Sequence, residues 1–125
     1  MNNKRQALVT GANKGIGLAI ARGLAEAGFF VWIGARDSAR GELAVADLRG
    51  HGLDVGLLAL DVADEASVHR ATATLTAQIT SLDILINNAG IAVDMTKPPS
   101  EVHMKDMKAV FEVNLFGPVR VTQAF

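Results

Sequence analysis

The stretch Thr10-Gly11-Ala12-Asn13-Lys14-Gly15-Ile16-Gly17 decides how the rest of the sequence is interpreted. It follows a short apolar run at residues 5–10, and apolar residues then recur at helical spacing between positions 16 and 27. Such a turn between a strand and a helix lets backbone N–H groups and the positive end of the helix dipole meet a phosphate. The three glycines could also form a turn and nothing more, but this setting favours a dinucleotide pyrophosphate site.

Strand-like and helix-like segments alternate along the rest of the chain. Short apolar runs predict strands at residues 5–10, 29–34, 54–60 and 83–86. Helices are expected after each strand; Asp37 or Ser38 caps the second, and Asp64 caps the third. The third helix has an apolar stripe, and the last begins near 101–103. The stripe comprises Val68, Ala71, Leu75 and Ile79.

This βαβαβαβα order predicts an α/β fold, a Rossmann-type doubly wound parallel sheet with right-handed crossovers. The strand order 3-2-1-4 of that fold places the fourth strand at an edge. Residues 1–125 are the length of one domain. The sequence stops within a helical pattern at residues 121–125. We therefore expect one dinucleotide-binding domain that is incomplete at its C-terminus.

Composition removes several classes of function. There are 12 Lys and Arg against 13 Asp and Glu, so no basic field is available for nucleic acid or for a membrane surface. The chain has no Cys, which excludes disulfides and thiolate chemistry. His51, His69 and His103 lack metal-ligand spacing, so we expect surface histidines and no metal. No leader or membrane-spanning pattern occurs, and a cytoplasmic protein is expected.

Four ordered motifs carry a family resemblance. The G-x-x-x-G-x-G spacing of the turn is followed by Asp61-Val62, by Asn87-Asn88-Ala89-Gly90 and by Asn114-Leu115-Phe116-Gly117. Together they resemble the short-chain dehydrogenase/reductase family over the whole chain. The stretch from Thr10 to Ile20, with Ala35-Arg36-Asp37, is most similar to the carbonyl-reductase branch.

The resemblance and the glycine turn together imply a cofactor site. Asn13 and Ile16 would lie at the ribose and phosphates, Asp61 and Val62 at the adenine, and residues 88–90 beside the adenosine ribose or the strand ends. Asp61 could instead be only a turn acid, and Asn87 and Asn88 could be residues that stitch neighbouring strands together. The predicted cofactor-binding residues are Gly11, Asn13, Lys14, Gly15, Ile16, Gly17, Arg36, Asp61, Val62, Asn88, Ala89 and Gly90.

The end of the second strand favours NADP(H) over NAD(H). NAD sites place an acid about 20 residues beyond the glycine turn, where it binds the ribose hydroxyls. This chain has Ala35 there, followed by Arg36, and Asp37 fits a helix cap. Arg36 and Lys14 can donate to a 2′-phosphate. The alternative is that both cations are merely solvated.

Asn114 is the one expected catalytic residue. It lies seven residues after Met107, on a stripe whose methionines are typical core residues, so its amide should be buried with a specific partner. Pro118 lacks the N–H that would bond the Asn114 carbonyl, which predicts a kink that frees this oxygen. In the family such a carbonyl holds a water in a proton relay. The interruption could also serve packing alone.

The remaining catalytic residues of the family are not among these residues. The family uses a Ser and a Tyr-x-x-x-Lys segment further along, and this chain contains no Tyr. We therefore expect an NADP(H)-dependent oxidoreductase that transfers hydride between nicotinamide and a carbonyl or alcohol substrate, seen as a fragment that is itself inactive. The alternative is a non-catalytic dinucleotide-binding module. The resemblance also implies a homo-oligomer that forms through the last helix.

Overall fold

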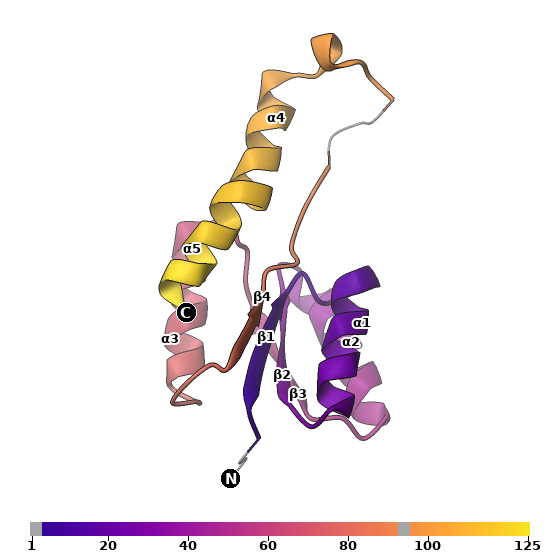
Figure 1. The fold of residues 1–125 in the computed structure, drawn as a ribbon, viewed down its shortest axis with the longest axis vertical. Coiled ribbons are helices and arrows are strands. Elements are labelled where there is room, and N and C mark those ends of the chain that lie inside the picture. The colour runs from indigo at the N-terminus through magenta and orange to yellow at the C-terminus, as the bar shows by residue number, and fades with distance from the viewer. Residues whose placement is uncertain (1–3, 93–95) are drawn as a thin grey trace.

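The computed structural model describes residues 4–92 and 96–125. Strands and helices alternate along the chain (Figure 1), as the sequence predicts. The strands are β1 (Gln6–Thr10), β2 (Phe30–Ala35), β3 (Val55–Ala59) and β4 (Ile84–Ile86). The helices are α1 (Gly15–Glu26), α2 (Ser38–Gly50), α3 (Glu65–Thr76), α4 (Met104–Phe111) and α5 (Gly117–Ala124), with a 3₁₀ turn at Pro99–Glu101 and a π turn at Glu112–Phe116.

The strands form one parallel sheet in the order β3-β2-β1-β4. Leu8 of β1 is in register with Trp32 of β2 on one side and with Leu85 of β4 on the other. The predicted α/β class, strand order and edge position of β4 are confirmed within the described residues. All four carboxyl ends consequently lie at one edge of the sheet.

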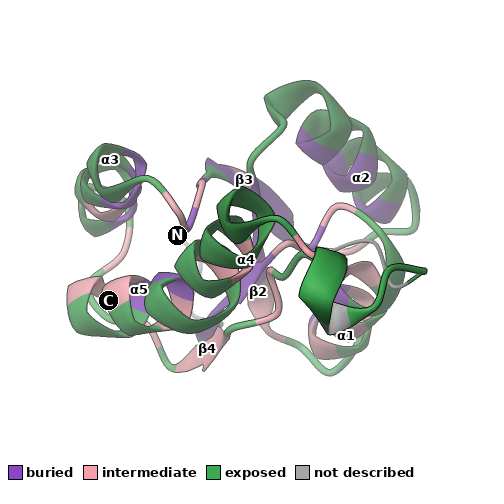
Figure 2. Cartoon of the chain, turned by 90° about the horizontal axis from the view of Figure 1, so that it is seen from above, coloured by how far each residue is buried: buried purple, intermediate pink, exposed green. Residues whose placement is uncertain are grey.

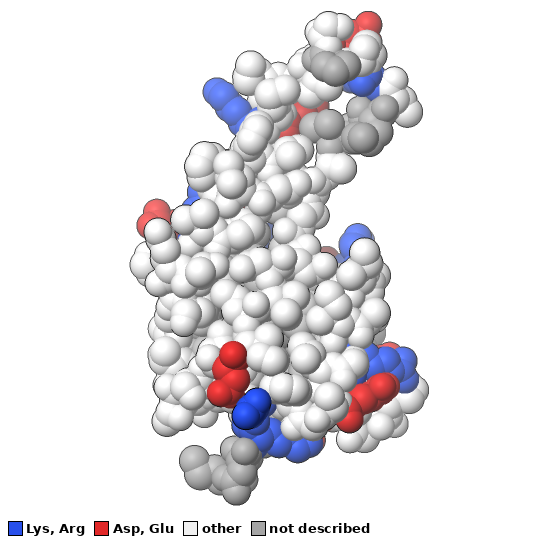
Figure 3. Space-filling model, viewed as in Figure 1, with Lys and Arg blue, Asp and Glu red and all other residues white. Residues whose placement is uncertain are grey.

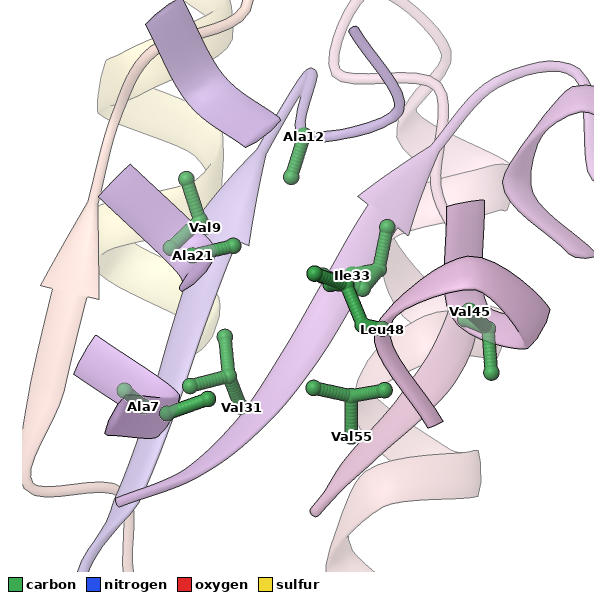
Figure 4. Close-up of a cluster of buried hydrophobic side chains, with 10 residues drawn as sticks. Ala7, Val9, Ala12, Ala21, Val31, Ile33, Val45, Leu48 and Val55 are labelled. Carbon is green, nitrogen blue, oxygen red and sulfur yellow. The ribbon is translucent and has the colours of Figure 1, made fainter. Parts of the chain in front are cut away.

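Helices cover both faces of the sheet, which explains why β1 and β2 are apolar without alternation. Consecutive strand residues point to opposite faces. Ala7 and Val9 pack with α1 and α2 in one buried cluster (Figure 4), whereas Leu8 packs with α3 and α5 in a second cluster. Seen from above, the buried residues concentrate on the strands and on the helix sides that face them (Figure 2).

Two of the expected helix caps are present, and one helix is shorter than expected. Asp37, rather than Ser38, precedes α2, and its carboxylate accepts from the Arg40 N–H. Asp64 caps α3 in the same way through the Ala66 N–H. Ile79 does not belong to the α3 stripe, because the helix ends at Thr76. It still packs against the second cluster.

The last predicted helix is divided into three parts. A 3₁₀ turn covers part of the expected start, and α4 begins only at Met104. The predicted interruption takes the form of the π turn Glu112–Phe116, immediately before α5. A π turn shifts the hydrogen-bond pattern by one residue, which suits the position where Pro118 has no N–H to donate.

The methionines of this segment are not core residues in the described chain. Met104 is 64% exposed, and Met107 and Phe111 are also exposed. The reason is positional: α4 extends beyond the carboxyl ends of the strands, so no strand lies beneath it (Figure 1). On the face shown in Figure 3, the middle of the molecule, around β4, carries few charged side chains; charges lie at the bottom, at the lower right, at the left edge and around α4 at the top. No described helix is long and apolar enough to cross a membrane.

Leu8 offers a test of the central packing. Its side chain is fully buried, so Leu8→Ala should lower the free energy of unfolding by about 2–5 kcal/mol, since it leaves a cavity between the sheet and α3. Leu43→Ala, at a leucine of α2 that is 73% exposed, is the matched control and should cost less than about 0.5 kcal/mol. Urea unfolding followed by circular dichroism measures both. Equal effects would contradict this packing.

Candidate functional site

A cavity of about 450 Å³ opens at the carboxyl ends of the strands. Its wall is made from the segments that follow β1, β2, β3 and β4, as expected for a doubly wound sheet. It gathers eleven of the twelve predicted cofactor residues. The lining residues are Gly11, Asn13, Lys14, Gly15, Ile16, Arg36, Asp37, Arg40, Leu60, Asp61, Val62, Asn88, Ala89, Gly90, Ile91 and Val113.

Gly17 is the predicted residue that does not line the cavity. It is buried one turn into α1, where a Cβ atom would lie 2.4 Å from both the Asn88 side-chain nitrogen and the Gly11 carbonyl oxygen. No real Cβ tolerates such distances. The glycine at this position therefore allows α1, the turn and the segment after β4 to pack in direct contact.

The N-terminus of α1 differs from those of α2 and α3. Lys14 precedes α1 and makes no side-chain cap, and the first turn contains no acidic residue. The other two helices are capped by the carboxylates of Asp37 and Asp64. The first N–H groups of a helix attract an anion when no side chain satisfies them. The end of α1 that faces the cavity is therefore suited to a phosphate.

The segment after β4 is tied to β1 by hydrogen bonds. The Thr10 hydroxyl oxygen accepts from the N–H groups of Asn88 at 2.9 Å and Ala89 at 3.0 Å. The Asn88 side-chain nitrogen donates to the Gly11 carbonyl at 3.1 Å, and that of Asn87 donates to the Thr122 hydroxyl. Both asparagines thus connect neighbouring segments, which was the alternative interpretation of their role. Asn88 nevertheless lines the cavity as well.

Three cationic side chains line the cavity. Lys14 and Arg36, both predicted, line it together with Arg40, which sequence reasoning missed. Arg40 lies in the first turn of α2, four residues after Arg36 in the sequence. Its Nε is 3.6 Å from the Asp37 carboxylate, so the nearest acid is paired.

Asp61 has a structural role in the loop after β3. Its carboxylate accepts from the Ala63 N–H at 3.0 Å, and its own N–H donates to the Ser67 hydroxyl at 2.8 Å. Asp61 therefore acts as a turn acid, which was the alternative to a role at the adenine. Asp61 and the buried Val62 also line the cavity, so a binding role for both stays a prediction.

Asn114 does not line the cavity and is exposed in the described chain, so its expected burial is wrong. Its position in the π turn, directly after the uncovered α4, accounts for the exposure. It does have the specific partner that was expected: its Oδ1 accepts from the Ile91 N–H at 2.8 Å, and its Nδ2 donates to the Ile91 carbonyl at 2.7 Å. The side chain therefore fixes the cavity wall at Ile91. A catalytic role for the main-chain carbonyl of Asn114 stays a prediction.

The three histidines do not lie together. His51, His69 and His103 are all exposed, as predicted, and lie on different elements. Over residues 4–92 and 96–125, no group of three metal-ligating side chains is brought together.

Residues 5–125 match the short chain dehydrogenase family. The chain belongs to this family. It is 38% identical over 121 residues to a 1-deoxy-11-beta-hydroxypentalenate dehydrogenase of Streptomyces avermitilis, covering 95% of this chain and 44% of that protein. It is 42% identical over 115 residues to Carbonyl reductase [NADPH] 1 of Macaca fascicularis, covering 90% and 40%.

Solved structures of the short-chain dehydrogenase family share this fold. A gluconate 5-dehydrogenase from Burkholderia cenocepacia, in complex with NADP and tartrate, superposes with a TM-score of 0.88 at 37% identity. The match covers 99% of this chain and 48% of that one. The chain thus spans less than half the length of these relatives.

Gly17 provides a test of the packing behind the cavity. Gly17→Ala should destabilise the fold and abolish ligand binding, because its Cβ would overlap Asn88 and the Gly11 carbonyl. Gly23→Ala is the control in the same helix: nothing lies within 4 Å of its Cβ, so it should stabilise the chain by about 0.5–1 kcal/mol. Thermal unfolding compares the two. A neutral Gly17→Ala would show that α1 does not pack as described.

Proposed function

We propose that this chain provides the NADP(H) site of a short-chain dehydrogenase that transfers hydride between nicotinamide and a carbonyl or alcohol substrate. The observation that carries the proposal is the cavity at the carboxyl ends of the strands, which combines an uncapped helix N-terminus with three cationic side chains. The relatives named for NADPH and the neighbour in complex with NADP support the same cofactor.

The residues present fit a phosphorylated dinucleotide. The N-terminus of α1 would hold the pyrophosphate, because its N–H groups have no side-chain cap. Arg36, Arg40 and Lys14 would bind the 2′-phosphate, since guanidinium donors match phosphate geometry and Ala35 has no carboxylate to repel it. Asp61 and Val62 would flank the adenine. The bound cofactor would supply the hydride, and these residues bind and orient it.

Part of the cavity lining is apolar. Ile91 and Val113 belong to it, and Asn114 holds Ile91 in place. An apolar lining would suit a nicotinamide ring and exclude water from its reactive face. Val113 also belongs to the π turn, where the missing N–H of Pro118 suits an Asn114 carbonyl that holds a water. That placement is the basis for the proposed relay role of Asn114.

We further propose that the whole protein forms a homo-oligomer through α4 and α5. Phe111 and Leu115 are about half exposed on this segment, and Met104 and Phe116 are exposed as well. Contiguous exposed apolar surface is typical of an interface.

The cation cluster yields a binding prediction. Arg36→Ala and Arg40→Ala should each weaken NADPH binding about ten- to a hundredfold, because each removes a charge-assisted hydrogen bond to the 2′-phosphate. NADH binding should change little. Arg22→Ala, at an exposed α1 arginine paired with Glu26, is the control. Isothermal titration of all variants with both nucleotides measures the effects. Equal affinities of the unaltered chain for NADPH and NADH would contradict the assignment.

The absence of Tyr yields a prediction about turnover. The 125-residue chain should bind NADPH yet reduce no ketone, because it contains no tyrosine to donate the proton. The measurement is NADPH oxidation by the purified chain with a panel of ketones, beside a preparation from cells that carry an empty vector. Ketone reduction above that background would contradict the prediction. Binding without turnover is also what the alternative, a non-catalytic dinucleotide-binding module, requires of this chain.

A further inference from the structure

Arg120 lies on α5 outside the cavity wall, yet its guanidinium reaches the loop after β3. Nη1 donates to the Val62 carbonyl at 3.1 Å and to the Glu112 carbonyl at 3.2 Å. Nη2 contacts the Glu112 carboxylate. The Arg120 side chain is 25% exposed, so these contacts are partly shielded from water. One guanidinium therefore binds three acceptors on two segments that are distant in the sequence.

The same two segments are packed without a gap. Gly117, the first residue of α5, is buried, and a Cβ there would lie 2.8 Å from the Val62 Cγ2. Val62 in turn is buried and lines the cavity. The start of α5, directly after the π turn, thus packs against Val62, a residue that lines the cavity.

The π turn Glu112–Phe116 is also attached to a second part of the cavity lining, at Ile91. Asn114 belongs to this turn and holds both backbone polar groups of Ile91. Val113, from the same turn, lines the cavity between the two attachments. The turn is therefore connected to Val62 through Arg120 and to Ile91 through Asn114.

We propose that Arg120 is a positioning residue: by fixing the π turn to the Val62 carbonyl, it sets where Asn114 holds Ile91 and hence the spacing between Val62 and Ile91 in the cavity lining. The turn needs such a support because Pro118 removes a helical N–H donor at this point. A guanidinium suits the task because its planar fork satisfies several acceptors at once, whereas an ammonium is a single point charge. Only the identity of the ligand, a dinucleotide, rests on the proposed function.

The experiment compares Arg120→Met with Arg22→Met in the 125-residue chain. The second variant removes another arginine that pairs with a glutamate on a helix, but at a site remote from the turn. The readout is amide hydrogen exchange without any nucleotide, measured by NMR. In Arg120→Met the Ile91 amide should exchange about tenfold faster, because its Asn114 acceptor is released, while the amides of Leu8 and Val9 stay protected. Arg22→Met should change none of these rates.

Two further variants separate the carbonyl contacts from the ion pair. Glu112→Ala removes the carboxylate but leaves both carbonyl acceptors, so its Ile91 exchange should stay within about twofold of the unaltered chain. The Ile91 exchange rate of Arg120→Lys should lie between the rates of Glu112→Ala and Arg120→Met. If Arg120→Met does not fold, the comparison of Arg120→Lys with Glu112→Ala decides: Arg120→Lys should exchange faster at Ile91. Unchanged Ile91 exchange in a folded Arg120→Met would overturn the proposal. An effect of Glu112→Ala as large as that of Arg120→Met would also overturn it.

A nucleotide titration keeps this proposal distinct from the proposed function. The Kd for 2′,5′-ADP, which contains the adenosine part alone, should rise severalfold in Arg120→Met and stay unchanged in Arg22→Met. Failure of the unaltered chain to bind 2′,5′-ADP or NADPH would contradict the dinucleotide function and leave the exchange result at Ile91 as the test of Arg120. Normal 2′,5′-ADP binding by Arg120→Met, together with unchanged Ile91 exchange, would contradict the positioning role alone.

Discussion

β1 hydrogen-bonds to β2 along one edge and to β4 along the other, in parallel on both sides. Because of this pairing, the segments that leave β1, β2 and β4 emerge side by side, and the glycine turn, Arg36 and Asn88 meet around one cavity. A parallel arrangement also requires each strand to be followed by a crossover, and the helices that supply it cover both faces. The place of the site is thus a consequence of strand order.

Small residues then decide how closely these segments approach. The first turn of α1 can contact Asn88 only because Gly17 has no side chain, and α5 can contact Val62 only because Gly117 has none. In both places the glycine lies behind the cavity wall. A larger residue at Gly17 or Gly117 would therefore change the shape of the cavity wall without removing a side chain that lines the cavity.

Much of this arrangement could be predicted from the sequence, because apolar strand runs, helix caps and glycine spacing are local signals. The strand order follows from those signals. Eleven of the twelve predicted cofactor residues line the cavity, and several of these were predicted from the family resemblance rather than from local signals. The exposure of Asn114 could not be predicted, since helical spacing shows a stripe but not what covers it. Arg40 was missed because a lone arginine on a helix is usually solvated, and only the fold brings it beside Arg36. The contact of Arg120 with Val62 joins residues far apart in the sequence, which no local pattern reveals.

The two acids nearest the proposed phosphate positions explain how the site can contain carboxylates and still be suited to an anion. Asp37 lines the cavity, but one of its oxygens accepts from the Arg40 N–H and the other is paired with the Arg40 guanidinium. Asp61 turns its carboxylate to the Ala63 N–H. Each acid is thus engaged by its own loop or helix, whereas the N-terminus of α1 has neither a cap nor an acid. Because these partners satisfy the acids locally, the uncapped N–H groups at the start of α1, together with Lys14 and Arg36, favour an anion in the cavity.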